Sequence, residues 1–432
     1  MTDRLTVLVI GNGGREHALA LALARDPSVA ALHCAPGNPG TAAVAVNHSV
    51  DALSGAAVAA LAVELGADLV VVGPEAPLVA GVADAVRGAG IACFGPSRAA
   101  ARIEGSKAFA KEVMAAAGVP TADARRCTTT EEAAAALDAF GPPYVIKDDG
   151  LAAGKGVLVT TDRDAALAHA AGCDVVVIEQ YLDGPEVSLF AVSDGSRVLP
   201  MQPAQDFKRA HDDDAGPNTG GMGAYTPLPW APDGLVEEVL ATVLQPTVDE
   251  LARRGTPFVG LLYAGLALTA AGVRVVEFNA RFGDPETQVL LPLLRTPLGV
   301  LLHAAARGAL GEVGSRLDWA DGAAVGVVVA SQGYPAAPVT GAVITGTEDV
   351  PAGVEVVHAG TARDADGRLV STGGRVLTVV GTGADLAAAR EAAYAGVDVV
   401  RLDGAFHRTD IARAAAETQR ARPADLLKGT RP

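Results

Sequence analysis

The sequence lacks several features that mark large classes of protein. It has only 4 cysteines in 432 residues, with no Cys-x-x-Cys pair, so the spacing indicates neither a disulfide framework nor a zinc site. Gly or Pro interrupts every apolar stretch before the roughly 18 residues that a membrane-spanning helix needs. The N-terminus enters a strand-like segment with no signal peptide before it. These absences predict a soluble, cytoplasmic protein with reduced cysteines.

Basic charge is also scarce. The sequence contains 34 Lys and Arg residues but 50 Asp and Glu residues. The resulting net charge of −16 argues against nucleic acid as a partner. Half of the residues are hydrophobic and 19% are charged, which is typical of an ordered globular chain of roughly two to four domains. Only six of the basic residues are lysines, and five of these fall between positions 107 and 208. We therefore expect the lysines to mark a local site.

The first hundred residues alternate short apolar runs with Ala-rich segments of helical character. This pattern predicts a doubly wound, Rossmann-like domain over residues 1–103. A helical segment is expected to follow over residues 97–118. The expected buried strands cover residues 5–10, 30–35, 69–73 and 91–94, with helices at 15–25 and 56–65.

The rest of the chain shows three further patterns. Residues 120–182 alternate strand, glycine-rich loop, strand, helix and strand, which predicts a small α+β lobe. A hairpin at 187–201 leads into a polar loop at 205–225, and such a long loop is usually functional or mobile. We expect a helix at 235–254, two strands at 260–279 and a separate small α/β domain at the C-terminal end, over residues 326–432.

The segment GNGGREH at residues 11–17 follows the first strand and opens the first helix. Free backbone N–H groups at a helix N-terminus favour an anion such as a sugar phosphate. A dinucleotide site fits poorly, since Glu16 occupies the third glycine position and no acidic residue ends the second strand. A plain tight turn remains an alternative. Gly73, Pro74 and Glu75 follow another parallel strand, at the edge where such sheets bind ligands.

Two segments suggest contacts with a nucleotide. Residues 147–157 contain three glycines together with Lys147 and Lys155, so the backbone can approach phosphate oxygens, although a simple hairpin loop is an equal alternative. The segment is not a Walker A loop. The apolar strand that ends near Glu179 could offer backbone groups to an adenine edge, with Glu186 accepting from ribose hydroxyls. An ordinary strand and turn would explain that second pattern as well.

The strand VVEFNAR at residues 275–281 gives the clearest indication of chemistry. Alternate residues of a strand share a face, so Glu277, Asn279 and Arg281 should project together. Two oxygen donors suit Mg²⁺, and an adjacent arginine can hold a phosphoryl group. A solvated polar strand face is the alternative.

In combination, these segments resemble the phosphoribosylamine–glycine ligase family of the ATP-grasp superfamily. The resemblance runs through nearly the whole chain. Its motifs are GNGGREHAL (11–19), GPEAPLVAG (73–81), EGSKAFAK (104–111), DGLAAGKGV (149–157), GPNTGGMGAY (216–225), EFNARFGDPETQ (277–288), GYP (333–335) and STGGRVL (371–377).

The resemblance implies a fold and a reaction. The fold would place an ATP-grasp core over residues 104–325, with a lid subdomain at about 120–190, between the N- and C-terminal domains. ATP, glycine and 5-phosphoribosylamine would give ADP, phosphate and glycinamide ribonucleotide, through transfer of the γ-phosphoryl group to glycine. Another ATP-grasp carboxylate–amine ligase is the nearest alternative. A monomer that binds neither nucleic acid nor membrane is expected.

The resemblance also implies roles for individual residues. Lys107 and Lys147 would hold the nucleotide phosphates, with a loop that contains Gly150, Gly154, Lys155 and Gly156 closing over them. Backbone groups of Gln180 and Leu182 would meet adenine beside Glu179, and Glu186 would meet ribose. Glu277 and Asn279 would bind Mg²⁺ or Mn²⁺, and Arg281 would join Lys147 as a catalytic residue. The substrate contacts would be Gly13, Gly14, Arg15, Gly73, Pro74 and Glu75 for phosphoribosylamine, Asn218, Thr219, Gly220 and Gly221 for glycine, and also Asp206, Lys208 and Asp284.

Three residues depart from the family pattern. Phe207 stands where histidine is usual, Asp148 where alanine is usual, and Gln180 where a second glutamate is common. Phe207 cannot form a side-chain hydrogen bond. Asp148 would weaken nucleotide affinity unless its side chain points away from the phosphates.

Overall fold

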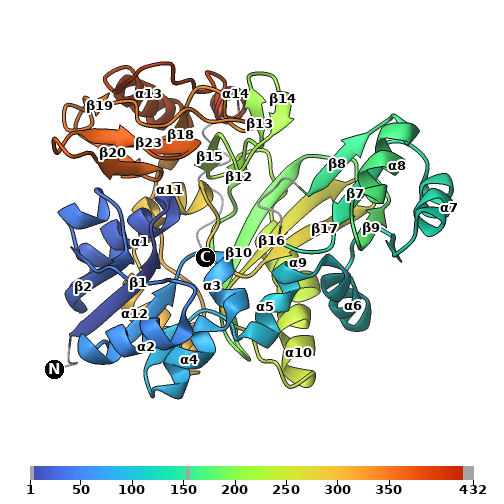
Figure 1. The fold of residues 1–432 in the computed structure, drawn as a ribbon, viewed down its shortest axis with the longest axis horizontal. Coiled ribbons are helices and arrows are strands. Elements are labelled where there is room, and N and C mark those ends of the chain that lie inside the picture. The colour runs from blue at the N-terminus through green and yellow to red at the C-terminus, as the bar shows by residue number, and fades with distance from the viewer. Residues whose placement is uncertain (1–3, 152–155, 422–432) are drawn as a thin grey trace.

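The structure is a computed structural model that describes residues 4–151 and 156–421. In Figure 1 the N-terminal elements lie at the lower left and the C-terminal elements above them. The elements between residues 124 and 179, which are expected to form a lid and are called the lid subdomain below, extend to the right. The seven sheets of the described part, parallel and antiparallel, confirm the expected multidomain α/β and α+β class. No helix in the described ranges is both long and apolar enough to cross a membrane.

The N-terminal elements form a five-stranded parallel sheet with the order β3-β2-β1-β4-β5, which confirms the Rossmann-like prediction. Val7 and Val9 pack into one core while Leu8 and Ile10 pack into another, because helices cover both faces. β1 and β4 are parallel neighbours, so the turns after them share one edge. The strands are β1 (Leu5–Gly11), β2 (Val29–Pro36), β3 (Val46–Asn47), β4 (Leu69–Val72) and β5 (Ala92–Phe94), and the helices are α1 (Gly14–Ala24), α2 (Gly55–Glu64), α3 (Glu75–Ala80) and α4 (Val82–Gly88).

The expected helical segment over residues 97–118 is confirmed, but it is not continuous. Two helices, α5 (Arg98–Gly105) and α6 (Lys107–Ala117), meet at Ser106, whose backbone is extended. The Ser106 hydroxyl accepts a hydrogen bond from the Phe109 N–H at 3.1 Å and so caps α6. The break makes Lys107 the first residue of a helix.

The lid subdomain contains a four-stranded antiparallel sheet with the order β6-β9-β7-β8. It has a small core of its own under two helices, and it confirms the expected alternation of strand, loop, strand, helix and strand. Its elements are β6 (Ala124–Cys127), α7 (Thr130–Phe140), β7 (Tyr144–Asp148), β8 (Val157–Thr160), α8 (Arg163–Ala171) and β9 (Val176–Glu179).

A second antiparallel sheet, β11-β10-β16-β17, forms the floor between the lid and the N-terminal domain. It contains the predicted hairpin and the two predicted strands. The expected helix at 235–254 is observed as two α-helices joined by a π-helical turn at Leu240–Leu244. The elements are β10 (Glu186–Asp194), β11 (Val198–Pro200), α9 (Leu235–Val239), α10 (Gln245–Arg253), β16 (Val259–Thr269) and β17 (Gly272–Asn279), followed by α11 (Glu286–Leu290) and α12 (Leu298–Ala306).

The expected polar loop at 205–225 is wrong, because this segment contains four short strands. Two of them, β12 (Gln205–Asp206) and β15 (Gly223–Thr226), join the C-terminal strands in one sheet, β12-β15-β18-β23-β20. The other two, β13 (Arg209–His211) and β14 (Ala215–Asn218), pair with each other. The remaining elements are β18 (Ala323–Ala330), β19 (Ile344–Thr345), β20 (Val354–His358), β21 (Thr361–Arg363), β22 (Leu369–Ser371), β23 (Arg375–Gly383), α13 (Leu386–Val397), β24 (Arg401–Leu402) and α14 (Arg413–Ala421).

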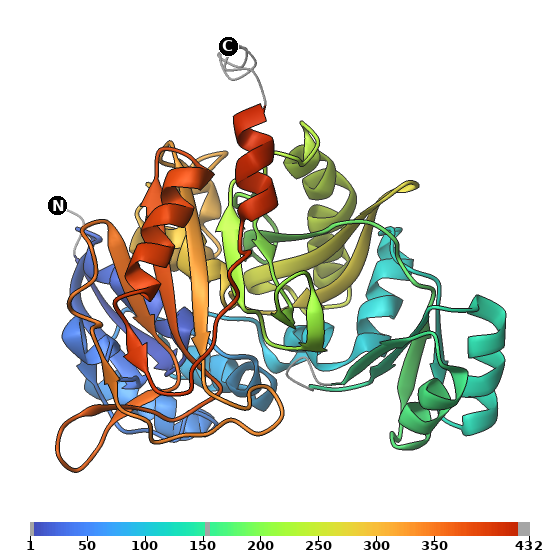
Figure 2. The ribbon, with the colours of Figure 1, turned by 90° about the horizontal axis from the view of Figure 1, so that it is seen from above.

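His17, within the first glycine-rich motif, joins the N-terminal domain to the C-terminal strands, which lie against each other in Figure 2. Its Nδ1 accepts a hydrogen bond from the His358 N–H at 2.8 Å. The ring also packs against Gly40, where a Cβ would lie 2.3 Å from His17 Cε1. Burial, together with the nearby His358, lowers the pKa of His17 to about 3. His17 is therefore neutral, and its role here is structural.

We expect acid to weaken this junction. The folded pKa of His17 lies below its ordinary value of 6.5, so its contribution to stability is present above pH 6.5 and is lost as pH falls toward 3. The loss should reach about 3 kcal/mol by pH 4. Thermal unfolding measured from pH 7 to pH 4 should show a shallower decline for His17→Asn. The exposed His211→Asn variant is the control, and an equal decline in all three proteins would refute the assignment.

Candidate active site

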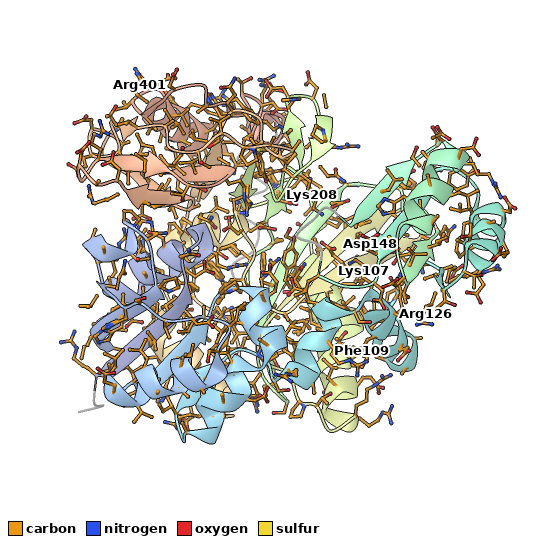
Figure 3. The ribbon with its side chains drawn as sticks, viewed as in Figure 1. Lys107, Phe109, Arg126, Asp148, Lys208 and Arg401 are labelled. Carbon is orange, nitrogen blue, oxygen red and sulfur yellow. The ribbon has the colours of Figure 1, made fainter. Side chains whose placement is uncertain are left out.

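The predicted site residues converge where the lid, the floor sheet and the carboxyl edge of the N-terminal sheet meet (Figure 3). Lys107 and Lys208 are labelled there, both near the middle of the view.

Lys147 is buried at the end of β7 and is held on two sides. Its Nζ lies 2.9 Å from Glu179 Oε2 and donates to the Val276 carbonyl at 2.8 Å. Lys111 contacts the other oxygen of Glu179 at 3.2 Å, and burial lowers the pKa of Lys111. Lys111 therefore belongs to the same ion-pair network as Lys147. Glu179 aligns two ammonium groups on the lid side of the site.

Lys107 lies at the N-terminus of α6, next to the start of the glycine-rich loop. Its Nζ donates to the Gly150 carbonyl at 2.9 Å, and burial lowers its pKa, with Glu277 opposing the shift. Asp149 accepts hydrogen bonds from the Ser106 hydroxyl at 3.0 Å and the Ala108 N–H at 3.2 Å, which fixes the loop to α6. Gly156 is buried, and its carbonyl accepts from the Asp148 N–H. The predicted loop residues Gly154 and Lys155 lie outside the described residues.

Glu277 lies on β17 amid basic side chains. Burial alone would raise the pKa of Glu277, but four cations lower it overall; they are Lys208, Lys147, Arg281 and Lys107. Within the described ranges, neither the Glu277 carboxylate nor the Asn279 amide has a side-chain hydrogen-bond partner. Two oxygen donors left unpaired beside one another on a strand face fit a hard divalent cation. Their donor chemistry therefore agrees with the predicted metal site.

Arg281 follows β17 and faces two carboxylates. Its Nη2 lies 3.2 Å from Glu104 Oε1 and its Nε lies 3.3 Å from Glu75 Oε2. Glu104 also accepts from the Ala280 N–H at 2.7 Å, so it positions the backbone beside Arg281. The Nε atom is buried and makes no hydrogen bond within the described part of the chain. No role for Glu104 was predicted from the sequence, although this residue opens the EGSKAFAK motif.

The first glycine-rich turn is closely packed. The Gly13 N–H donates to Glu16 Oε2 at 2.6 Å, and a Cβ at Gly73 would lie 2.1 Å from Glu16 Oε1, so glycine is required there. Pro74 is the N-cap of α3, and Glu75 lies 3.8 Å from the Arg15 guanidinium. Part of the predicted anion site is thus occupied by the Glu16 carboxylate.

Arg15 connects this turn to the loop after β17. Its Nη1 donates to the Phe282 carbonyl at 3.1 Å, and its N–H donates to Asp284 Oδ2 at 3.2 Å. A Cβ at Gly14 would lie 2.8 Å from Gln288 Nε2, which itself donates to Asp284. The Gln288 Oε1 atom is buried and has no hydrogen-bond partner in residues 4–151 and 156–421.

Arg375, on β23, connects the C-terminal sheet to this region. Its Nη1 donates to the carbonyls of Gly220 and Asp284, both at 2.6 Å, and lies 3.4 Å from Asp284 Oδ1. Arg375 and Arg15 together lower the pKa of Asp284, against the effect of burial. The sequence did not single out Arg375. Its only signal was its place in the STGGRVL motif.

The segment with the predicted glycine contacts is held by its own backbone and by neighbours. Thr219 bonds to the Lys208 carbonyl through both its N–H and its hydroxyl, and the Gly220 N–H donates to the Tyr334 hydroxyl at 3.0 Å. The Gly221 N–H donates to the Thr219 hydroxyl. Asn218, at the end of β14, is exposed, and it pairs with Arg209 of β13.

Asp206 and Lys208 lie beside the carboxylates of the floor sheet. Burial raises the pKa of Asp206 to about 7, and the nearby Glu286 and Glu186 add to the effect. Lys208 forms an ion pair with Glu186, the residue predicted to meet ribose. Glu286, which the sequence did not identify, is buried and accepts hydrogen bonds from Tyr263 at 2.8 Å and Ser188 at 3.0 Å.

The predicted adenine contacts lie at the end of β9. Gln180 is exposed, and its N–H already donates to the Asp123 carbonyl at 2.9 Å. Its carbonyl group is the part left for a ligand. Leu182 is half-buried, two residues farther along the chain.

The structure explains two of the unusual residues. The Asp148 side chain bonds to His169 and Cys173 of the lid, so its charge is turned away from Lys147 and the strand face that carries it. The Phe207 ring lies under the Arg408 guanidinium, 4.8 Å from the ring centroid. Arg408 is itself fixed by Asp214 and Asp410, so Phe207 serves as a packing surface.

Comparison with known proteins shows that this chain is similar to members of one enzyme family. Three models of phosphoribosylglycinamide synthetase match: its N domain at residues 5–104, its ATP-grasp (A) domain at 105–287 and its C domain at 324–414. The chain is 67% identical to a phosphoribosylamine–glycine ligase of Streptomyces coelicolor, over 95% of this chain and 100% of the relative. It is 59% identical to one of Mycobacterium tuberculosis, over 96% and 99%.

Solved structures with similar folds include a member of the same family. A crystal structure of phosphoribosylamine–glycine ligase from Thermotoga maritima has a TM-score of 0.82 and 33% identity, covering 94% of this chain and 100% of that one. The biotin carboxylase domain of the Hydrogenobacter thermophilus 2-oxoglutarate carboxylase, solved with MgADP, shares only the fold, with a TM-score of 0.69 and 17% identity over 94% and 92% of the two chains.

Proposed function

The chain belongs to the phosphoribosylglycinamide synthetase family, and from that membership we propose how its residues divide the work of the reaction. The enzyme is a ligase that forms a C–N bond: it joins glycine to 5-phosphoribosylamine at the expense of ATP, in purine biosynthesis. ATP is used together with a divalent metal. The roles of the individual residues, and the choice of metal, are our proposal.

We propose that the carboxylate of glycine first takes the γ-phosphoryl group of ATP and releases ADP. The amine of phosphoribosylamine then attacks the carbonyl carbon of glycyl phosphate, and phosphate leaves. A carboxylate is a poor acyl donor, and the phosphate group supplies the leaving group that it lacks. Such transfers depend on positioning and on neutralising negative charge more than on a protein nucleophile.

One observation carries the proposal: Lys107, Lys147, Lys208 and Arg281 surround a single carboxylate, that of Glu277, and together lower its pKa. A polyphosphate needs this concentration of positive charge, whereas a neutral ligand does not. We assign the nucleotide phosphates to Lys107 and Lys147, with Glu179 orienting Lys147. Gly150 and Gly156 flank the phosphate side of the lid.

We assign the transferring phosphoryl group to Arg281. Its buried Nε is a donor without a hydrogen-bond partner in the described residues, and its charge is held in place by Glu75 and Glu104. A guanidinium that is fixed before the reaction stabilises charge with little rearrangement. The Gln180 carbonyl and Leu182 would contact adenine, and Glu186 the ribose.

Glu277 and Asn279 would hold the metal, which we propose to be Mg²⁺ or Mn²⁺ because both donors are hard oxygen atoms. When bound, such an ion neutralises charge on the phosphate oxygens. Glu277 itself stays ionised for this task because the surrounding cations lower its pKa.

The two other substrates would meet at the N-terminal edge. Gly13, Gly14, Arg15 and the turn of Gly73, Pro74 and Glu75 would bind phosphoribosylamine, since Arg15 is buried and reaches the site. Glycine would lie near the segment Asn218, Thr219, Gly220 and Gly221, with Asp206, Lys208 and Asp284 as further polar contacts.

We also propose that the enzyme acts as a cytoplasmic monomer. Its four free cysteines suit a reducing compartment. The proposed domain boundaries lie at 103/104 and 325/326.

The test is ADP release measured with each substrate omitted in turn. We expect turnover only when ATP, glycine, phosphoribosylamine and metal are all present. With ATP, glycine and metal but no phosphoribosylamine, hydroxylamine should trap the acyl phosphate as glycine hydroxamate. Turnover with another acid or amine, but not with this pair, would favour the alternative of a different ATP-grasp carboxylate–amine ligase.

Replacing Arg375 by Met should impair substrate binding without affecting ATP. The guanidinium links the carbonyls of Gly220 and Asp284, which belong to the two proposed substrate regions. We expect the KM for glycine or phosphoribosylamine to rise about tenfold or more, with the KM for ATP little changed. Arg375→Lys, which keeps the charge, should recover part of the loss. An equal effect on all three substrates would point to a general loss of structure instead.

A further inference from the structure

Three side chains of different chemistry converge on the outer part of the lid subdomain. Asp148 Oδ1 lies 2.9 Å from His169 Nε2 and 3.0 Å from Cys173 Sγ. The candidate ligand atoms of the three residues all lie within 4.8 Å of one another. The proposed function uses none of these atoms. Asp148 is labelled on the lid in Figure 3.

The fold, and not the sequence spacing, brings these residues together. Asp148 is the last residue of β7, His169 lies in the last turn of α8, and Cys173 follows two residues after that helix ends. Helix α8 packs on β7, so the three side chains meet at the corner between them. This explains why the cysteine spacing alone did not indicate a metal site.

The surroundings suit a bound ion. Below the cluster is the small apolar core of the lid, which includes Ile146, Ala170 and Val176, with Cys173 packed against it. Above it the side chains are open to solvent: Asp148 is 35% exposed and His169 is 25% exposed. A metal held there would have three protein ligands, an apolar floor, and a free position facing water.

From this geometry we propose that Asp148, His169 and Cys173 form a Zn²⁺ site with water as the fourth ligand. Thiolate, imidazole and carboxylate are the ligands that Zn²⁺ takes in proteins, commonly in a tetrahedral arrangement. Tetrahedral bonds of about 2.0–2.3 Å place ligand atoms about 3.3–3.6 Å apart. The present separations of 2.9 and 3.0 Å would need to widen by only a few tenths of an ångström.

Metal binding at Asp148 would affect the proposed nucleotide site, because the residues on both sides of Asp148 in the chain belong to that site. Asp148 stands between Lys147, which faces Glu179, and Asp149, which is bonded to the N-terminus of α6. An ion bound to Asp148 would tie this junction to α8. It would therefore stabilise the lid at the strand end that leads into the glycine-rich loop.

The test is a titration of the full-length, metal-free protein with CoCl₂ in excess Mg²⁺, followed by displacement with ZnCl₂. We expect one equivalent of Co²⁺ to give a thiolate-to-metal charge-transfer band and strong tetrahedral absorption, both abolished by Zn²⁺. The Glu277 and Asn279 site contains no sulfur, so it cannot produce that band. The readout is therefore independent of the proposed function.

Three variants and a control complete the experiment. Asp148→Ala, His169→Ala and Cys173→Ser should each weaken Zn²⁺ binding by about 100-fold or more, and Cys173→Ser should remove the thiolate band. Asp164→Ala removes an exposed carboxylate from the same helix and should bind as the parent does. Circular dichroism checks that each variant is folded. Absence of the band from the parent, or its persistence in Cys173→Ser, would overturn the proposal.

Discussion

Replacing Glu277 by Gln is expected to lower kcat about 100-fold or more and to abolish the response of the enzyme to Mg²⁺. The substitution preserves the shape of the side chain and removes its charge. An amide oxygen is a much weaker ligand for Mg²⁺ than a carboxylate, and the four surrounding cations would lose their common counter-charge. The measurement is the initial rate as a function of Mg²⁺ concentration at saturating ATP.

Glu312→Gln provides the matched control, because Glu312 is exposed and remote from the site. It should behave as the parent enzyme does. Both variants should have far-ultraviolet circular dichroism spectra like that of the parent. If Glu277→Gln kept its full Mg²⁺-dependent rate, the metal would have to be held by other residues.

Replacing Lys147 by Arg should reduce kcat/KM for ATP about 100-fold, even though the charge is kept. The ammonium group fits between Glu179 Oε2 at 2.9 Å and the Val276 carbonyl at 2.8 Å, and its side chain is only 5% exposed. A guanidinium is longer and planar, so it cannot occupy this space without displacing Glu179 or β17. Steady-state kinetics with varied ATP would measure the change, which corresponds to about 2.7 kcal/mol.

The control for this variant is Lys111→Arg. Lys111 contacts the other oxygen of the same carboxylate but is not assigned to the nucleotide. We expect a much smaller effect on kcat/KM. Equal losses in the two variants would mean that Lys147 acts by orienting Glu179 and does not contact phosphate.

The alternation of apolar runs and Ala-rich segments was sufficient to predict the N-terminal sheet. Buried parallel strands carry apolar residues on both faces, and this pattern is visible in the sequence of β1 and β4. The break between α5 and α6 was missed because the residues on both sides favour helix. Helix α5 ends there because the Ser106 hydroxyl caps α6 and Asp149 contacts the N-terminus of α6.

The segment at 205–225 was read as a loop because its residues are polar and rich in glycine. Its strands are short, and they are stabilised by pairing with β18, which lies about a hundred residues later in the chain. Pairing of that kind depends on tertiary contacts and leaves little local signal. The same reasoning applies to Arg375, since its partners at Gly220 and Asp284 are distant in sequence.

The candidate site was easier to predict where one strand carries several of its residues. Glu277, Asn279 and Arg281 follow from alternation alone. The carboxylates that hold the basic groups, such as Glu104 beside Arg281, depend on the meeting of helices and strands from different domains. Sequence reasoning therefore found the groups proposed to touch substrate more readily than those that position them.

The sheet β12-β15-β18-β23-β20 combines strands from the middle of the chain with strands from its C-terminal part. Cutting the chain between these two parts would therefore divide the sheet. β15 pairs on one side with β12 and on the other with β18. A fragment that ended before Ala323 would leave the N–H and C=O groups of β15 without partners along that edge. Unpaired edges of this kind recruit strands from other molecules and lead to aggregation. The last hundred residues thus protect the middle of the chain from self-association.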